Sequence, residues 1–193
     1  MDALHTFKRR TRQPAFDSAT LCEVRGKMHH GSSLHGQAHW HSVLHNAYFL
    51  VEQELGEVTP ENEATIHLFA LFHDSQRFDD GHDDGHGGRG AVLLASMRPS
   101  VLRVSDPAGA TKTLLCGRSE IIRAMAACAY HTEALPAFID AQVDAPFVTD
   151  TVQQICFDSD RLDLPRAGTI PSSRYLFTDT ARRMADGKTL VHW

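Results

Sequence analysis

Apolar residues recur at helical spacing along most of this chain. Between residues 39 and 55 they occupy positions 40, 43, 44, 47, 50 and 51, which form one stripe on a helix of about 3.6 residues per turn. Residues 61–74 are apolar on nearly every side, so we expect this segment to be a central, buried helix. The same period predicts further helices at residues 91–97, 111–131, 147–162 and 173–184.

Signals for strands are weak, because alternating β-branched residues never persist for more than a few positions. The glycine-rich stretch 79–90 is typical of a loop, and residues 99–110 and 135–146 are expected to be connections. The pattern therefore predicts an all-α fold: a single-domain bundle of five to seven helices.

Composition narrows the class of protein. The chain has 193 residues, of which 42% are hydrophobic and 22% charged, and its formal net charge of -5 argues against general nucleic-acid binding. No apolar run approaches the roughly 18 residues that a membrane-spanning helix needs, and the first residues do not resemble a secretory signal. The four cysteines are far apart and are expected to be reduced, which points to the cytoplasm.

Histidine is the unusual residue of this chain. Ten of the 13 histidines fall between His29 and His86, in a region that also contains many aspartates. One of them, His73, stands with Asp74 directly after the apolar run 68–72, where burying either group without a partner costs on the order of several kcal/mol. A divalent cation offsets such a cost, and a set of imidazoles and carboxylates suits Mn, Fe, Co, Ni or Zn.

Three stretches carry a family resemblance: HGQAHWHSVLHNA around His39, LFALFHDSQR around His73 and Asp74, and FDSDRLDLPRAG around Asp160. Their order resembles the H…HD…D signature of the HD-domain superfamily of metal-dependent phosphohydrolases. The resemblance covers about residues 33–184 and implies an HD-type metal-binding domain over that range. Residues 1–32 are then a partly ordered N-terminal extension, and residues 185–193 a C-terminal tail.

The resemblance assigns the metal ligands as His39, His73, Asp74 and Asp160, with open positions left for water and substrate. The metal would activate a water for attack on a phosphate ester or anhydride, with Asp74 as part of the catalytic machinery. The expected substrate is a nucleotide or another small phosphorylated metabolite. No membrane partner is expected, and the sequence leaves open whether the protein is a monomer or a homo-oligomer.

Further residues have predicted roles in catalysis and substrate binding. His86 and His131 match histidines of superfamily members that bind two metals, so they either hold a second cation or bind the substrate phosphate as charged imidazoles; the spacing favours one metal. Guanidinium groups match phosphate, which makes Arg77 and Arg89 candidate substrate-binding residues. His35 is a third candidate, with a role in the turn at His35 and Gly36 as the alternative.

Asp158 is a candidate for orienting one of the metal-binding histidines. Two other functions fit the same signature. One is a di-iron oxygenase of the HD type, and the other is a non-catalytic module that senses a nucleotide. The intact H…HD…D signature argues against the sensing module.

Overall fold

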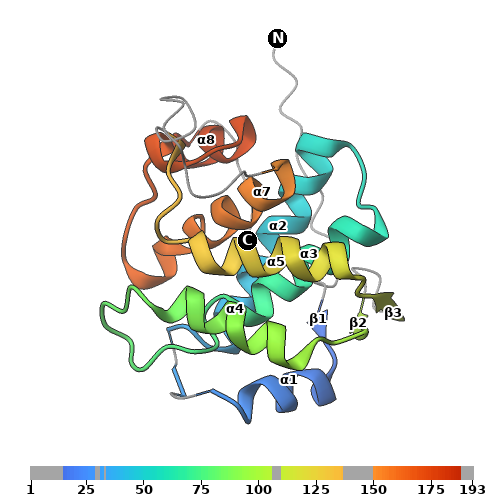
Figure 1. The fold of residues 1–193 in the computed structure, drawn as a ribbon. Coiled ribbons are helices and arrows are strands. Elements are labelled where there is room, and N and C mark those ends of the chain that lie inside the picture. The colour runs from blue at the N-terminus through green and yellow to red at the C-terminus, as the bar shows by residue number, and fades with distance from the viewer. Residues whose placement is uncertain (1–14, 29–30, 33, 106–109, 137–149, 188–193) are drawn as a thin grey trace.

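The computed structural model describes residues 15–28, 31–32, 34–105, 110–136 and 150–187. Helices make up most of this part of the chain (Figure 1), which confirms the predicted helical bundle in a single domain. The α-helices are α1 (Ser18–Arg25), α2 (Gln37–Leu55), α3 (Pro60–Phe72), α4 (His86–Met97), α5 (Arg118–Tyr130), α7 (Thr151–Arg161) and α8 (Asp179–Ala185). Two short 3-10 helices, η1 (Leu164–Ala167) and η2 (Ser173–Tyr175), separate α7 from α8.

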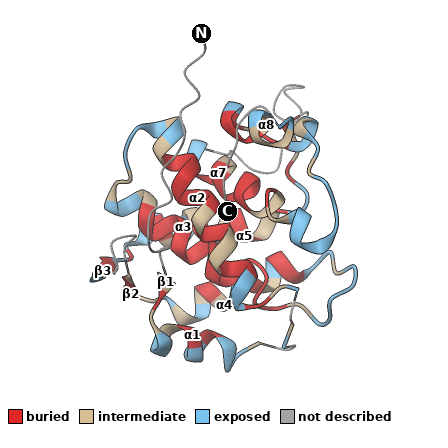
Figure 2. Ribbon diagram, turned by 180° about the vertical axis from the view of Figure 1, so that it is seen from behind, coloured by how far each residue is buried: buried red, intermediate tan, exposed pale blue. Residues whose placement is uncertain are grey.

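Helix α3 is the centre of the bundle. It packs against α2, α4, α5 and α7, and Figure 2 shows it buried among its neighbours. Its residues Ile66 and Phe69 are fully buried. Thr59 caps its N-terminus by accepting a hydrogen bond from the backbone N–H of Asn62, and Pro60 occupies the first turn, where no donor is needed. Polar groups at the C-terminal end of α3 therefore lie deep in the protein.

Helices α2 and α7 run past α3 and pack against each other. Helix α2 ends at Gly56, whose φ of 81° lies in the left-handed region that commonly terminates helices. Helix α7 begins at a capping box in which Asp150 and Gln153 exchange hydrogen bonds between side chain and backbone. This packing brings the first turn of α2 close to the last turn of α7.

A small antiparallel sheet departs from the predicted pattern. Its strands are β1 (Ala15–Phe16), β2 (Val101–Ser105) and β3 (Thr111–Leu115), in the order β1-β2-β3. The prediction that residues 99–110 form a connection is therefore wrong for Val101–Ser105, which form β2. The expected helix 111–131 is wrong at its start, because α5 begins only at Arg118.

The physical reason lies in the pairing of the two longer strands. Leu102, Val104 and Leu114 point into the core, while Val101 and Leu115 on the same strands are exposed. This alternation is the two-residue period of a strand, but it lasts for only five residues in each segment. The backbone hydrogen bonds that stabilise the strands form only when the two segments meet.

Helix α4 begins at His86, earlier than the predicted start at residue 91, so the stretch 79–90 is a loop only as far as Gly85. Two of its glycines lie at helix contacts. A Cβ atom at Gly90 would overlap the carbonyl oxygen of Phe72, and one at Gly87 would lie 2.9 Å from the His131 ring. The glycines therefore let α4 approach α3 and α5 closely.

The predicted helix 173–184 is interrupted between η2 and α8. The carboxylate of Asp158 accepts hydrogen bonds from the backbone N–H groups of Phe177 and Thr178, each 2.8 Å long. These two donors are therefore not available to a continuous helix. Thr178 then caps the N-terminus of α8 through its side chain.

Several expectations concern residues outside the described part of the chain. Residues 137–149 contain most of the expected connection 135–146 and the start of the predicted helix 147–162, and residues 1–14 and 188–193 belong to the predicted extension and tail. In the described part of the extension, α1 contacts α3 and places Leu21 and Val24 in the core. None of the helices described is both long enough and apolar enough to cross a membrane.

Candidate metal centre

Five of the buried polar residues in the described part of the chain lie where helices begin or end and face one another. His39 lies in the first turn of α2, His73 and Asp74 follow α3, His86 opens α4, and His131 follows α5. Their exposed fractions are 4%, 0%, 3%, 2% and 2%. Because these helix ends pack together, residues far apart in the sequence meet in one buried cluster.

The first set of donors consists of His39, His73, Asp74 and Asp160. The Nε2 atoms of His39 and His73 are 3.0 Å apart, and Oδ1 of Asp160 lies 3.2 and 3.5 Å from them. Oδ2 of Asp74 lies 3.3 and 3.7 Å from the same two nitrogens. Neighbouring ligands of an ion with bonds of about 2.0–2.2 Å stand about 3.0–3.5 Å apart. The spacing of His39, His73 and Asp160 therefore suits a single metal ion, and Oδ2 of Asp74 faces the same two imidazoles.

The second set consists of Asp74, His86 and His131. Nε2 of His86 lies 2.9 Å from Nε2 of His131 and 2.9 Å from Oδ1 of Asp74, and the distance from His131 to the same oxygen is 3.8 Å. Asp74 thus faces the first set with Oδ2 and the second set with Oδ1. A carboxylate placed in this way can bridge two ions.

The orientation of the imidazoles is fixed by hydrogen bonds on their far side. Each ring that faces the cluster through Nε2 binds an acceptor through Nδ1: His39 binds the Asp163 carboxylate, His73 the Phe69 carbonyl, His86 the Asp83 carbonyl and His131 the Cys128 carbonyl. A carbonyl oxygen only accepts, so Nδ1 carries a proton in those three rings. Nε2 then presents a lone pair when the ring is neutral and donates a hydrogen bond when the ring is charged. Lone pairs that face each other at 2.9–3.0 Å repel unless a proton or a metal ion lies between them.

The electrostatics of the cluster favour charged carboxylates. Burial alone would raise the pKa of Asp74, but the charge of His73 and hydrogen bonds from His35, His39 and His86 hold that pKa well below its ordinary value. Burial opposes ionisation of Asp160 in the same way, and its hydrogen bonds with His39 and His73 outweigh it, so its pKa is also well below the ordinary value. Both side chains are therefore in the form that binds cations.

The histidines differ in their electrostatic surroundings. Burial would lower the pKa of His39, yet its bonds to Asp160, Asp163 and Asp74 raise that pKa well above the ordinary value. Burial lowers the pKa of His131 to about 4, so this ring is neutral at pH 7. A cation in the cluster would replace the proton that His39 otherwise holds.

Arg77 and His35, which the sequence assigned to substrate binding, both contact Asp74. Nη1 of Arg77 lies 3.4 Å from Oδ1 of Asp74 and 3.2 Å from Nε2 of His86. Nδ1 of His35 lies 2.8 Å from Oδ2 of Asp74 and must donate, since the ionised carboxylate only accepts. Both residues therefore belong to the cluster.

Arg89, the third predicted substrate-binding residue, lies outside the cluster. Its guanidinium donates to the Gln76 carbonyl at 3.0 Å, forms an ion pair with Asp83 at 2.5 Å and stands 4.0 Å from the centre of the Phe78 ring. Since the carbonyl of Asp83 binds His86, Arg89 supports the loop that positions His86.

The expectation that Asp158 orients a histidine is wrong, because its carboxylate binds the backbone of Phe177 and Thr178 instead. Asp163 has that role: its Oδ2 lies 2.7 Å from Nδ1 of His39. Its spacing of three residues after Asp160, at the end of one helix, is a signal that the sequence contains. Asp83 binds His86 through its backbone carbonyl. Every residue has this group, so the residue types in the sequence could not indicate the contact.

We compared the chain with family models, with curated proteins and with solved structures, and none of these comparisons gives a match. The HD-domain resemblance therefore rests on the motif residues and stays a hypothesis about the family. The fold and the cluster define a broader class: a helical protein of one domain whose buried histidines and aspartates could hold metal ions.

Proposed function

We propose that this protein is a metal-dependent hydrolase that cleaves a phosphate ester or anhydride of a small molecule, such as a nucleotide. The observation that carries the proposal is the convergence of four imidazole Nε2 atoms on the carboxylates of Asp74 and Asp160. This donor set suits Mn, Fe, Co, Ni or Zn better than Mg. The order of the same residues along the chain supports an HD-type enzyme.

His39, His73, Asp74 and Asp160 would hold one ion, and Asp74, His86 and His131 a second. Such an ion lowers the pKa of a bound water toward neutrality and polarises a phosphoryl oxygen. The side chain of Asp160 is 22% exposed, whereas those of the other five ligands are at most 5% exposed. The phosphate would therefore approach from the side of Asp160.

Two residues of the cluster would act directly on the phosphate or on its ligands. Arg77 has its Nη1 atom at Asp74 and His86, where it can donate a hydrogen bond to a phosphate oxygen. Its Nε and Nη2 atoms donate to the backbone carbonyls of Asp79 and Gly81. His35, whose side chain is 23% exposed, would hold Asp74 in its bridging orientation. In hydrolysis, the water oxygen bonds to phosphorus, the bond to the leaving oxygen breaks, and that oxygen takes up a proton.

The same geometry supports a second candidate function. A carboxylate that faces two sets of histidines also suits two iron ions, so a di-iron oxygenase of the HD type is the alternative. The two functions differ in their requirement for oxygen. Consumption of dissolved oxygen by the iron-loaded protein, with no release of phosphate, would favour the oxygenase.

The hydrolase proposal is tested by removing the metal ion with a chelator and then adding metal ions back. After treatment with a chelator, we expect no hydrolysis of phenyl phosphate or of a panel of nucleotides, and we expect activity to return with Mn, Fe(II), Co, Ni or Zn. The metal content is measured by elemental analysis at each step. If no metal restores hydrolysis, the hydrolase proposal fails and the sensing module gains support.

A variant separates the cluster from adventitious metal sites. Asp74→Asn keeps the shape of the side chain but removes its charge, and we expect it to lose both bound metal and activity. Asp84→Asn is the matched control, because the Asp84 side chain is 81% exposed and lies outside the cluster. Stoichiometric metal and full activity in Asp74→Asn would show that the site is elsewhere.

The cysteines support a reducing compartment such as the cytoplasm. All four are free, and Cys116, Cys128 and Cys156 are buried. Burial raises the pKa of Cys116 to about 11 and that of Cys128 further, so these thiols stay protonated and unreactive.

A further inference from the structure

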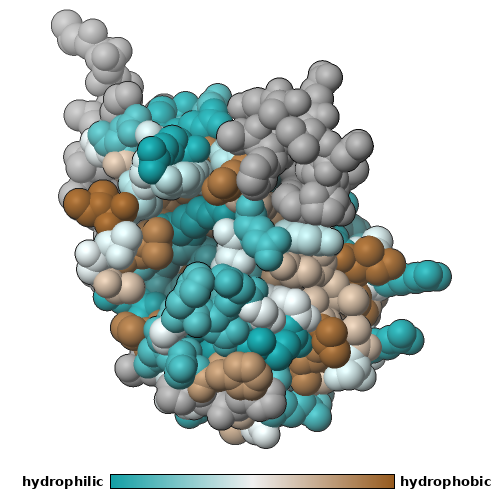
Figure 3. Space-filling view, turned by 60° about the vertical axis from the view of Figure 1, so that its left-hand side comes forward, coloured by the Kyte–Doolittle hydropathy of each residue, from teal (hydrophilic) through white to brown (hydrophobic). Residues whose placement is uncertain are grey.

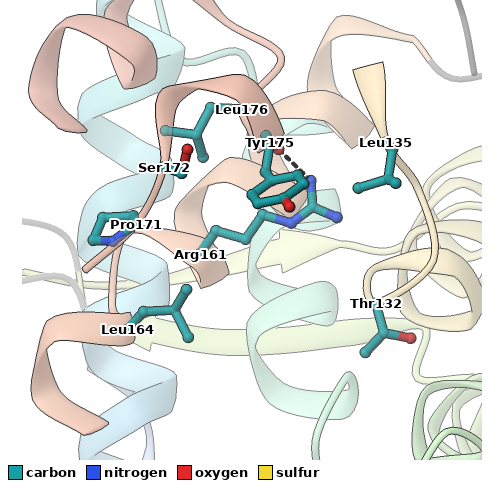
Figure 4. Close-up of a pocket in the computed structure, with 8 residues that line it drawn as sticks. All are labelled: Thr132, Leu135, Arg161, Leu164, Pro171, Ser172, Tyr175 and Leu176. Carbon is teal, nitrogen blue, oxygen red and sulfur yellow. Dashed lines mark hydrogen bonds between the residues drawn. The ribbon is translucent and has the colours of Figure 1, made fainter. Parts of the chain in front are cut away.

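A cavity of about 190 Å³ lies beside the metal centre, between the end of α5 and the segment that joins α7 to α8 (Figure 4). Its walls are formed mainly by apolar side chains, among them Leu135, Leu164, Pro171 and Leu176, together with the ring of Tyr175. Leu176 is fully buried, whereas Leu164 and Tyr175 are 37% and 39% exposed. The cavity thus has a closed inner wall and a rim that reaches the surface.

The cavity and the candidate metal centre are formed in part by residues that are neighbours in the sequence. Three of its lining residues, Thr132, Arg161 and Leu164, directly follow His131, Asp160 and Asp163 in the sequence. His131 and Asp160 are candidate ligands, and Asp163 orients His39. Figure 3 shows the face on which the segments after α7 and the loop before α4 come forward, and this face is hollowed between hydrophilic residues. Arg161 also donates to the backbone carbonyl of His131 at 2.9 Å, so the cavity wall contacts the backbone of a candidate ligand.

The one charged side chain that lines the cavity already has hydrogen-bond partners in the cavity walls. Arg161 is the one ionisable side chain with a formal charge at pH 7 among the lining residues. Its guanidinium donates to the backbone carbonyls of Tyr175 at 2.7 Å, of His131 at 2.9 Å and of Ala134 at 2.5 Å. Figure 4 shows Arg161 and Tyr175 side by side with the first of these bonds. Three of the Arg161 donors are thus committed to the walls, and none of the lining residues carries a carboxylate, so the cavity suits an uncharged group.

The size and the walls of the cavity limit this group further. An apolar protein cavity of about 150 Å³ accommodates benzene, so about 190 Å³ holds one compact ring system and little more. Aromatic rings gain from stacking on a Tyr ring such as that of Tyr175. Thr132 and Ser172 line the cavity as well, and their hydroxyl groups are available as hydrogen-bonding partners for a polar ring edge.

We propose that this cavity receives an uncharged, planar ring of the substrate while the phosphate of the same molecule lies at the metal centre. The substrate class would then be phosphate monoesters of a compact ring-bearing alcohol. Hydrolysis adds water across the bond between phosphorus and the ester oxygen, giving inorganic phosphate and the free alcohol. The inference rests on the proposed hydrolase function for its substrate, but the ring site itself can be tested without turnover.

The first test measures binding of the ring alone. We expect phenol or adenosine, titrated into the metal-loaded protein and followed by calorimetry, to bind, whereas glycerol, which lacks a ring, does not. Phenol represents an aryl ring and adenosine a nucleobase, so the two arms identify the kind of ring. Binding of neither compound would overturn the proposal whether or not the protein hydrolyses phosphate.

The second test uses variants on the partly exposed rim, where folding is least affected. Tyr175→Ala and Leu164→Ala should each weaken binding of the preferred ring by about tenfold, because they remove its stacking and apolar contacts. They should raise the KM for the corresponding phosphate ester by a similar factor, and they should affect the KM for glycerol phosphate less, because glycerol phosphate has no ring. Leu115→Ala is the control, since Leu115 is 76% exposed on β3 and does not line the cavity.

The two proposals fail in different ways. If ring binding is lost in Tyr175→Ala but the wild-type protein hydrolyses no phosphate ester, the ring site stands and the hydrolase function falls. If phosphate esters are hydrolysed but both rim variants bind and turn over the ring-bearing ester like the wild type, the cavity is not the ring site.

Discussion

Oδ2 of Asp163 accepts a hydrogen bond from Nδ1 of His39 across 2.7 Å, and this bond turns the Nε2 atom of His39 toward His73 and Asp160. His39 belongs to the first turn of α2, while Asp163 follows the end of α7. The bond therefore links two helices at the candidate metal centre. It also determines which nitrogen of the ring is free to bind a metal ion.

Replacing Asp163 should weaken metal binding without preventing it. Asp163→Asn keeps an oxygen that can accept the bond from His39 but removes its charge, and loss of such a supporting partner typically lowers metal affinity about 10–100-fold. Competition with a chelating dye measures this affinity. Asp84→Asn is again the matched control, because its carboxylate is 81% exposed and pairs with the exposed His82, outside the cluster. Unchanged affinity in Asp163→Asn would show that the ring of His39 is held by other contacts.

Two neighbouring glycines of α4 should respond in opposite ways to alanine. A Cβ at Gly87 would overlap the carbonyl of Cys128 and lie 2.9 Å from Nδ1 of His131, so Gly87→Ala should force α4 away from α5. Overpacking of this kind costs about 1–3 kcal/mol. A Cβ at Gly88 has no atom within 4 Å, so Gly88→Ala should be neutral or stabilise the helix by about 0.5 kcal/mol.

Denaturant unfolding and metal titration of both glycine variants test this contrast. Gly87→Ala should lose stability and also bind metal more weakly at His86 and His131, because the two residues lie on the helices that it separates. If the two alanine variants had the same free energy of unfolding, α4 could move away from α5 without destabilising the protein, and the prediction would be wrong.

Arg77 should control whether a second ion binds. Its Nη1 atom lies 3.4 Å from Asp74 Oδ1 and 3.2 Å from His86 Nε2, which are two of the donors that the second set offers. A guanidinium and a divalent cation repel each other at this distance. Arg77→Met should therefore raise the affinity for a second ion by about tenfold and bring the metal content from one toward two per chain.

Elemental analysis after equilibration at several metal concentrations measures this stoichiometry. Arg103→Met is the control. Arg103 is exposed on β2, and its replacement by Met removes the same charge from another part of the protein. A second ion that binds equally well with and without the Arg77 guanidinium would contradict the prediction.

His67 should make the fold sensitive to acid. It is fully buried in α3, where Nε2 lies 3.0 Å from the Tyr48 hydroxyl, and burial, together with the charges of Lys112 and His41, lowers its pKa from 6.5 to about 3. Between these two values the unfolded chain binds a proton that the folded protein does not. The free energy of unfolding should therefore fall as the pH is lowered, by about 2 kcal/mol at this residue between pH 7 and 5.

The contribution of His67 is measured as a difference between proteins. His67→Gln keeps a polar group beside Tyr48 but does not titrate, so its stability should fall less between pH 7 and 5 than that of the wild type. His82→Gln, at a side chain that is 88% exposed, should follow the wild type. If the wild type and His67→Gln lose stability equally, His67 accepts its proton without unfolding.

The sequence by itself determined the helical class and most members of the cluster. Helical periodicity is a local property, since each turn of α2, α3, α5 and α7 is stabilised by bonds between residues four apart. The pair His73 and Asp74 was visible because ionisable groups rarely follow an apolar run of five residues without a partner. His39, His86, His131 and Asp160 were predicted through their order along the chain, which resembles the HD-domain signature.

Tertiary structure decided everything that depends on contacts between distant segments. Strands β2 and β3 are too short to be recognised before they pair, and the choice between Asp158 and Asp163 as the partner of His39 depends on which carboxylate the packing of α2 against α7 turns toward the ring. The position of Asp74 between the two sets of imidazoles exists only when five helix ends meet, those of α2, α3, α4, α5 and α7. The cavity beside Arg161 likewise forms only when the segment after α7 lies against the end of α5. The physical reason is that hydrogen bonds and close packing act over a few ångströms in space, whatever the separation along the chain.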